Sequence, residues 1–163
     1  MGYNSTGTVT VDGAGSKWTN SSDLFIGGFD TGSLTISNGG TVSNGGGYLG
    51  YAADSAGTVA VGGAGSKWTN SGDLYVGGFG TGALTISNGG AVSNGSGFVG
   101  YTADSAGTVF VDGAGSTWTN SGDLYIGKGG AGTLRDCQEF RVRAGIMGKK
   151  ESHYVATQRP CDT

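Results

Sequence analysis

Glycines recur at one fixed interval along most of the chain, and this period constrains the fold more than any other feature. The recurring glycines are Gly7, Gly32, Gly57, Gly82, Gly107 and Gly132. Each of them opens a similar run, such as GTVTV, GSLTI or GTVAV. Their period of about 25 residues falls within the range of about 20 to 50 that is typical of repeat architectures, so we expect a series of stacked units.

A stronger repeat with twice this period is superimposed on the first. The string SKWTNSGDLYVGG occurs with small changes at 16–28, 66–78 and 116–128. Its tryptophans are Trp18, Trp68 and Trp118. Halfway between the copies, Val42 and Val92 occupy the corresponding position. A position that alternates tryptophan with valine is an apolar one, so we expect the three tryptophans to lie in the core.

Each glycine-to-glycine unit contains three short alternating runs. In the unit that begins at Gly57, these runs are Thr58–Val61, Ser66–Thr69 and Asp73–Val76. Alternation with Thr, Val, Ile and aromatic residues indicates strands, and Gly and Asn between them supply the positive φ angles of tight corners. Successive leading strands must be parallel, because the rest of each unit provides the return path. The sequence therefore predicts an all-β fold, a right-handed parallel β-helix.

A β-propeller is the main alternative architecture, because a blade of about 50 residues also uses Gly pairs and a tryptophan. Three blades are too few to close a ring, since propellers typically have about four to eight. A blade also gives no reason for the shorter period of the glycines. We therefore predict a β-helix over residues 1–134, with about 25 residues and three short strands per turn.

Alternation also predicts which side chains point inward. In the first run these are Val9 and Val11, Leu34 and Ile36, Val59 and Val61, Leu84 and Ile86, and Val109 and Val111. In the third run they are Ile26, Leu49, Val76, Val99 and Ile126. One asparagine ends every middle run: Asn20, Asn44, Asn70, Asn94 and Asn120. Stacked asparagines can form a hydrogen-bonded ladder, so we interpret them as structural.

The outward positions of the third run form the candidate contact surface. They are all aromatic: Phe25, Tyr48, Tyr75, Phe98 and Tyr125. Such a stripe either stacks on sugars or on another chain, or only shields the sheet from water. If one of these residues contacts a partner, we expect it to be Tyr75.

Titratable chemistry is sparse in the repeats. Residues 1–134 contain no His, Cys, Glu or Arg, whereas general acid–base catalysis needs positioned titratable groups. The aspartates lie at strand edges or turns, where Asp commonly serves as a turn residue. The glycine-rich calcium-binding nonapeptide is missing. We therefore expect no enzyme activity, no metal and no cofactor. The enzymatic alternative is a β-helix that hydrolyses polysaccharides.

The charge is also low, with three lysines against eight aspartates in residues 1–134. This acidic balance argues against nucleic-acid binding, which needs clustered Lys or Arg. No stretch reaches the apolar length of a membrane span, and no signal peptide opens the chain. The start, Met1-Gly2-Tyr3, matches residues 99–101, so we expect the chain to begin within a repeat.

The composition changes abruptly at Arg135. The tail 135–163 holds both cysteines, the single His and six of the nine basic residues. Cys137, His153 and Cys161 have no catalytic or metal-binding spacing. We expect this tail to be a disordered or aberrant segment.

The pattern GTVxVxGAGSxWTNSGDLYVG…GTGxLTISNGGxVSN resembles the passenger repeats of bacterial autotransporters, the type V secretion adhesins. The resemblance covers residues 2–134. It implies a β-helical stalk outside a Gram-negative outer membrane, with adhesive function and no catalytic residues. The implied partners are surface glycans or proteins of host or bacteria, or further copies that associate through the solenoid ends.

The chain departs from this family at its end, because the tail cannot supply the translocator barrel that the resemblance implies. We therefore hypothesise a fragment of a surface-exposed passenger. The alternatives are a carbohydrate-binding module that uses the aromatic stripe and a non-functional product of a truncated gene.

Overall fold

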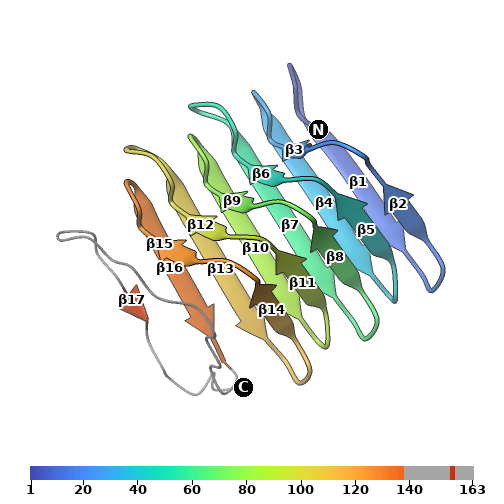
Figure 1. The fold of residues 1–163 in the computed structure, drawn as a ribbon. Coiled ribbons are helices and arrows are strands. Elements are labelled where there is room, and N and C mark those ends of the chain that lie inside the picture. Colours follow the sequence, from blue (N-terminus) through green and yellow to red (C-terminus); the bar gives the residue numbers. More distant parts are fainter. Residues whose placement is uncertain (138–154, 157–163) are drawn as a thin grey trace.

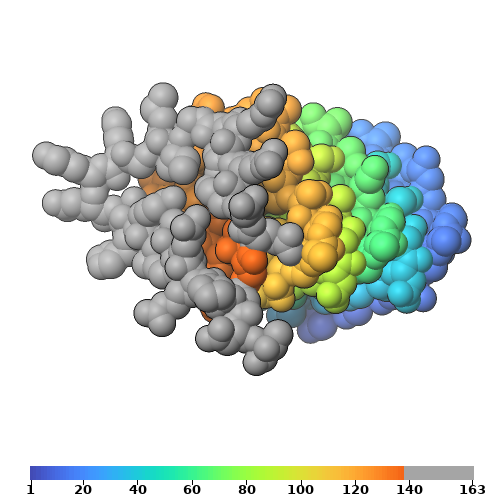
Figure 2. Space-filling view, turned by 90° about the horizontal axis from the view of Figure 1, so that it is seen from below, coloured from blue at the N-terminus to red at the C-terminus, as the bar shows by residue number. Residues whose placement is uncertain are grey.

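The computed structural model describes residues 1–137 and 155–156, which form a parallel β-solenoid with three strands per turn (Figure 1). The prediction of an all-β solenoid with about 25 residues per turn is therefore confirmed. No helix in this part of the chain is long and apolar enough to cross a membrane. In the space-filling view, successive turns follow one another as bands from blue to orange (Figure 2).

The first sheet contains the long first strand of each turn and ends with the short β17, all in parallel order. These strands are β1 (Gly7–Asp12), β4 (Thr31–Ser37), β7 (Ala56–Gly62), β10 (Thr81–Ser87), β13 (Ala106–Asp112), β16 (Ala131–Asp136) and β17 (Val155–Ala156). The short β17 pairs with β16, which itself includes the first two residues of the predicted tail, and tail residues 138–154 and 157–163 lie outside the described residues.

Two narrower sheets close the other sides of the solenoid (Figure 1). The second sheet comprises β2 (Lys17–Thr19), β5 (Thr41–Asn44), β8 (Lys67–Asn70), β11 (Ala91–Asn94) and β14 (Thr117–Asn120). The third sheet comprises β3 (Leu24–Ile26), β6 (Gly47–Leu49), β9 (Leu74–Val76), β12 (Gly97–Val99) and β15 (Leu124–Ile126).

The strand register distinguishes two kinds of turn. In the second sheet, Trp18 pairs with Val42, and Val42 pairs in turn with Trp68, so that the second step along the sequence is longer than the first. We call residues 7–31, 57–81 and 107–131 the Trp-type turns, and residues 32–56 and 82–106 the Val-type turns. The backbone of the first sheet repeats with every turn, whereas the full pattern repeats only with every second turn.

Glycine at the corner between the third and first strands is required by both its φ angle and its surroundings. Gly27 has a φ of +69°, a region that side chains rarely adopt. A Cβ atom at Gly27 would also overlap the backbone of Ala56 and Gly57 at the start of β7. This close approach explains why the corner glycines recur in every unit.

The interior is filled by the aliphatic columns that alternation predicted. The first-sheet column is buried from Val11 onward, and Val9 is only partly buried because β1 is the edge strand. The third sheet also buries Leu24, Leu74 and Leu124, which lie in register with Gly47 and Gly97. These leucines were not among the predicted inward residues.

The tryptophans point inward, as the sequence predicted. Trp68 is fully buried, while Trp18 and Trp118 are partly buried against the core. The Trp68 indole Nε1–H donates to Asn44 Oδ1 of the preceding turn at 2.7 Å. Since a buried polar group is costly without a partner, this bond explains why an asparagine accompanies the tryptophan.

The asparagines are bonded in pairs rather than in one continuous ladder. Asn44 Nδ2 donates to Asn70 Oδ1 at 2.7 Å, and Asn94 Nδ2 donates to Asn120 Oδ1 at 2.6 Å. Between the pairs, Asn70 Nδ2 reaches the Ser93 carbonyl instead. The predicted structural role is therefore correct, but the ladder is interrupted at every second step.

Candidate functional site

The outward side of the third sheet carries the predicted aromatic stripe, which we call the inner aromatic row. The register places its five rings in one column: Phe25, Tyr48, Tyr75, Phe98 and Tyr125. Neighbouring rings are nearly parallel, with centroids 4.7–5.0 Å apart and interplanar angles of 2–14°. Phe98 is buried and the other four are half-buried.

Stacking within the inner aromatic row covers the faces of its middle rings. Tyr75 lies between Tyr48, at 4.9 Å, and Phe98, at 4.7 Å. A third ring, Tyr101, packs against Tyr75 at 84° with its centroid at 5.0 Å. A sugar or an aromatic partner that stacks needs a free ring face. The contact role expected for Tyr75 stays a prediction, and its geometry offers a partner only a ring edge.

A second aromatic row borders the first, and the alternation of the sequence did not reveal it. This outer aromatic row consists of Tyr3, Phe29, Tyr51, Phe79 and Tyr101. Tyr51 makes edge contacts with Phe25 at 4.7 Å and with Tyr48 at 5.7 Å. Tyr3, Phe29 and Phe79 are 69%, 55% and 49% exposed. The outer row therefore contains the most exposed rings of the aromatic surface.

The sequence did contain a signal for the outer row. In each of these positions the aromatic residue directly follows a glycine at the corner of the turn: 2–3, 28–29, 50–51, 78–79 and 100–101. A corner glycine interrupts the alternation of the strand, so period-two reasoning does not predict the direction of the next side chain. Only the recurrence of a Gly-aromatic pair in successive turns could have marked these residues.

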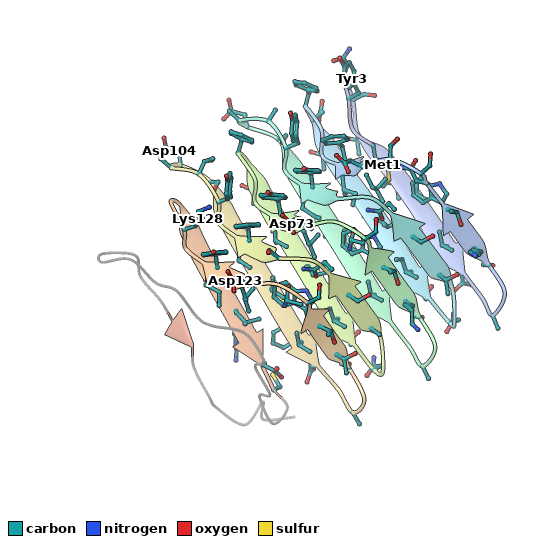
Figure 3. The ribbon with its side chains drawn as sticks, in the orientation of Figure 1. Met1, Tyr3, Asp73, Asp104, Asp123 and Lys128 are labelled. Atoms are coloured by element: carbon teal, nitrogen blue, oxygen red, sulfur yellow. The ribbon has the colours of Figure 1, made fainter. Side chains whose placement is uncertain are left out.

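A lysine joins the aromatic surface near the C-terminal end of the described solenoid. Lys128 Nζ lies 4.9 Å from the ring centroid of Phe98, 4.8 Å from Tyr101 and 5.1 Å from Tyr125. These distances are those of cation–π interactions. In Figure 3, Lys128 and Tyr3 lie on the same side of the solenoid, toward its opposite ends. The aromatic surface thus carries one positive charge at one end.

The tyrosines of the inner row remain protonated at neutral pH. Burial raises the pKa of Tyr75 to about 12, and the negative charge of Asp73 acts in the same direction. Burial also raises the pKa of Tyr48. A hydrogen bond of 3.1 Å from Tyr125 to Asp123 raises the pKa of the Tyr125 phenol. The row therefore offers neutral phenols at its edge.

Two aspartates, Asp12 and Asp23, accept hydrogen bonds from residues of the next turn. Asp23 Oδ1 accepts a hydrogen bond of 2.6 Å from the Gly46 backbone N–H. Asp12 Oδ1 accepts bonds from Ser37 Oγ at 2.6 Å and Asn38 Nδ2 at 2.8 Å, and these bonds lower the pKa of Asp12. Within residues 1–137 and 155–156, no group of three or more His, Cys, Asp or Glu could hold a metal.

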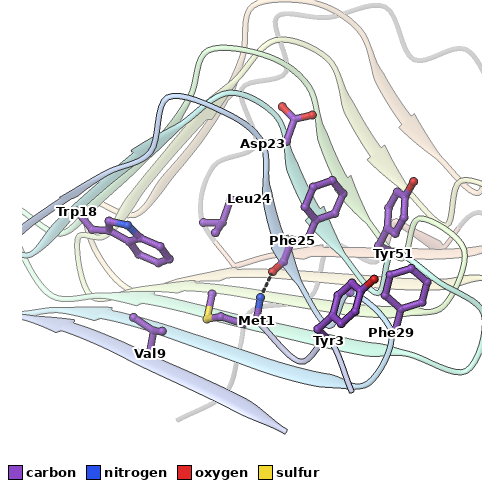
Figure 4. A pocket seen from close by; sticks show the side chains of 10 residues that line it. Met1, Tyr3, Val9, Trp18, Asp23, Leu24, Phe25, Phe29 and Tyr51 are labelled. Atoms are coloured by element: carbon purple, nitrogen blue, oxygen red, sulfur yellow. Dashed lines mark hydrogen bonds between the residues drawn. The ribbon is translucent and has the colours of Figure 1, made fainter. Parts of the chain in front are cut away.

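A mostly apolar hollow of about 520 Å³ lies at the N-terminal end of the solenoid. Val9, Trp18 and Leu24 line its interior side, and Tyr3, Phe29 and Tyr51 line its outer side (Figure 4). The Met1 ammonium lies between the two sides and donates a hydrogen bond of 2.6 Å to the Phe25 carbonyl (Figure 4). This hollow exists because no strand pairs with the outer edge of the first turn among the described residues.

A comparison of the chain with protein families, curated proteins and solved structures found no match in any of the three. The function of the aromatic surface is therefore inferred from its geometry. That geometry combines exposed rings on a regular wall with aspartates that are engaged in turn hydrogen bonds.

Proposed function

We propose that the chain is a structural and adhesive β-solenoid that contacts its partners through the outer aromatic row. One observation carries the proposal, namely the exposure of Tyr3, Phe29 and Phe79 along a wall that repeats at fixed spacing. Exposed aromatic patches on a soluble surface mark sites of interaction, and aromatic side chains contribute most to such contacts. Because the outer row is fixed to a rigid stack, several weak contacts can act together.

We also propose that the chain has no catalytic activity and is displayed at a cell surface as part of an autotransporter passenger. The resemblance of residues 2–134 to passenger repeats supports this location. The hydrogen bonds of Asp12 and Asp23 to neighbouring turns support a structural role for the carboxylates. A repeat solenoid gains stability with each added turn, which suits a stalk of variable length.

The exposed rings also favour a second candidate function, which is the binding of an extended glycan. Phe29 and Phe79 occupy equivalent positions two turns apart, which corresponds to a separation of about 10 Å. Both rings are about half exposed, at 55% and 49%. A chain of sugars that runs along the solenoid axis could stack on both rings at once.

An adhesion assay with matched variants tests the first proposal. Beads coated with the purified chain should aggregate with one another or adhere to cultured cells. The double variant Phe29→Ala/Phe79→Ala should lose most of this adhesion, because it removes two exposed rings. The control is Thr58→Ala/Thr108→Ala, which alters exposed residues on the first sheet and should leave adhesion unchanged.

The same proteins applied to a glycan array separate the two candidates. Adhesion without glycan binding supports a protein partner, whereas glycan binding that depends on Phe29 and Phe79 supports the second function. Adhesion that is equal in both double variants would show that the outer row is not the contact surface. Surface labelling of the native cells, followed by fractionation, tests the proposed location.

A further inference from the structure

The Lys128 ammonium shows how the aromatic surface holds a positive charge. Its Nζ lies 4.9 Å from the ring centroid of Phe98, 4.8 Å from that of Tyr101 and 5.1 Å from that of Tyr125. Phe98 and Tyr125 are stacked with centroids 5.0 Å apart, and Tyr101 stands at 77° to Phe98 with its centroid at 5.2 Å. Two stacked rings and one nearly perpendicular ring thus form a site for one ammonium group.

The same arrangement of three rings occurs one full repeat earlier in the chain, without a lysine. Tyr48 and Tyr75 are stacked with centroids 4.9 Å apart, and Tyr51 stands at 87° to Tyr48 with its centroid at 5.7 Å. The position equivalent to Lys128 is Gly78. We call Tyr48, Tyr51 and Tyr75 the tyrosine site. Its rings are in place, but Gly78 has no side chain that could put an ammonium group among them.

A fourth ring flanks the tyrosine site. Tyr51 packs against Tyr48, the N-terminal ring of the stacked pair, whereas Tyr101 packs against Tyr75, the C-terminal ring, at 84° with its centroid at 5.0 Å. The gap that an ammonium group would occupy therefore has an aromatic ring at each end and the stacked pair along its side.

Phe79 borders this gap and does not fill it. Within residues 1–137 and 155–156, its ring contacts only Tyr51, with centroids 5.9 Å apart. A ring that filled the gap would also lie close to Tyr48 and Tyr75, just as Lys128 Nζ lies close to Phe98 and Tyr125. The place of the ammonium group is therefore not taken by an aromatic side chain.

The charge around the tyrosine site is negative. Besides burial, the negative charge of Asp73 raises the pKa of both Tyr48 and Tyr75, and that of Asp23 also raises the pKa of Tyr48. The other lysines of residues 1–134 lie in strands β2 and β8 of the second sheet. These charges favour a cationic ligand over an anionic one.

The distances in the lysine-filled copy suit a methylated ammonium group. A methyl carbon lies about 1.5 Å from its nitrogen and contacts a ring carbon at about 3.5 Å. A nitrogen that is 4.8–5.1 Å from three ring centroids, as Lys128 Nζ is, therefore leaves room for a methyl group toward each ring. Aromatic sites of this kind typically recognise quaternary ammonium ligands.

We propose that the tyrosine site binds the methylated ammonium group of a ligand, such as the trimethylammonium group of choline. The ligand nitrogen takes the place that Lys128 Nζ has in the third Trp-type turn, with methyl groups against Tyr48, Tyr51 and Tyr75. The proposal goes beyond adhesion, which rests on the exposure of Phe29 and Phe79 rather than on these three rings.

Choline is the probe, added to the ¹⁵N-labelled full chain and followed by NMR. Its control is the uncharged isostere in which a carbon atom replaces the nitrogen. Choline should shift the backbone signals of Tyr51 and Gly78 saturably, and it should bind at least about fivefold more tightly than the isostere. Equal binding of the two compounds, or no saturable shift below about 100 mM choline, would overturn the proposal.

Two variants exchange the lysine between the copies. Gly78→Lys should fill the tyrosine site and abolish the Tyr51 response. A Cβ atom at Gly78 makes only ordinary contacts, the nearest at 3.5 Å, so the fold should be retained. Thr58→Lys adds the same charge at an exposed position of the first sheet and should leave the response unchanged. Lys128→Gly should open the other copy, so that Tyr125 also responds to choline.

A Tyr51 response that persists in Gly78→Lys would overturn the site, and so would a Lys128→Gly chain without a new response. Vesicles of phosphatidylcholine distinguish the sources of the group. Co-sedimentation of the parent chain but not of Gly78→Lys would support a lipid headgroup as the ligand. Choline binding without co-sedimentation would support a soluble one.

Discussion

Trp-type and Val-type turns have the same three-strand backbone, but they place core side chains of different size at equivalent positions. A Trp-type turn places the large side chains of Trp68 and Leu74 in the core, whereas a Val-type turn has Val42 and Gly47 at the paired positions. The Trp68 indole extends under Gly47 of the neighbouring turn. Core volume is thus balanced between adjacent turns, so the unit of packing is a pair of turns, which is also the longer repeat of the sequence.

Converting a Trp-type turn into a Val-type turn should therefore be the most damaging change. Trp68→Val removes a fully buried indole and leaves Asn44 Oδ1 without its donor. A large-to-small core substitution of this kind costs about 3–5 kcal/mol, because a cavity and a lost hydrogen bond add together. Urea unfolding followed by circular dichroism measures the loss.

Trp18→Val is the matched control for this substitution. Trp18 has the same sequence context, but it is only partly buried at the open end of the stack. We expect a smaller loss of about 1–2 kcal/mol, because the Trp18 side chain is only partly buried and its indole has no hydrogen-bond acceptor among the described residues. Equal losses at the two positions would contradict the idea that the preceding turn gives the tryptophan its importance.

The role of the Val-type turn in each pair can be tested by enlarging its buried glycine. Gly47→Ala introduces a methyl group that must displace Trp68, Leu74 or Asn70. Overpacking of a core costs about 1–3 kcal/mol. The control is Gly78→Ala, because a Cβ atom there would make only ordinary contacts, the nearest at 3.5 Å from the Gly50 carbonyl oxygen. A comparable free energy of unfolding for both variants would refute the pairing of large and small residues.

The sequence alone predicted the solenoid because its signal is repeated in every turn. Alternation identified the first-sheet columns, and the exchange of Trp18 for Val42 identified the middle column as core. It did not explain why tryptophan returns only every second turn. That reason depends on the contact of Trp68 with Gly47 of the adjacent turn, which single-strand periodicity does not contain.

The candidate surface was predictable only in part. The inner aromatic row follows from strand alternation, but its burial depends on ring stacking and on cover from Tyr51 and Tyr101. Those outer residues follow corner glycines, where the direction of a side chain is set by the turn rather than by a period. Sequence reasoning therefore chose Tyr75 as the contact, whereas Phe29 and Phe79 are the more exposed rings.

The inner aromatic row has one ring in each turn, of either type. We therefore expect the contribution of its rings to stability not to alternate between Trp-type and Val-type turns. The pKa of Tyr75 is raised from 10.0 to about 12 in the folded state, chiefly by burial. Below pH 10 the Tyr75 phenol is protonated in both the folded and the unfolded state. Its full contribution to the free energy of unfolding is therefore present there. Between pH 10 and pH 12 the unfolded state releases its proton first, so stability falls as the pH rises.

The Tyr75→Phe variant isolates this contribution, because phenylalanine does not titrate and already occurs at positions 25 and 98 of the row. We expect nearly equal stability of variant and parent below pH 10. Across the interval up to pH 12, the urea midpoint of the parent should fall more steeply than that of the variant. Parallel pH profiles would show that burial of the Tyr75 phenol does not contribute.

The smallest effect is expected where the Trp-type turns differ from one another. Glycine occupies positions 28 and 78, but Lys128 stands in the third turn with its Nζ about equally distant from three rings. A partly exposed cation–π contact contributes about 0.5–1 kcal/mol, so Lys128→Met should destabilise by that amount, while Lys128→Arg should retain most of it. Since the attraction is electrostatic, methionine and arginine should differ even though both can pack against the rings. Equal stability of these two variants in urea would mean that Lys128 stabilises the fold by packing alone and that its charge does not contribute.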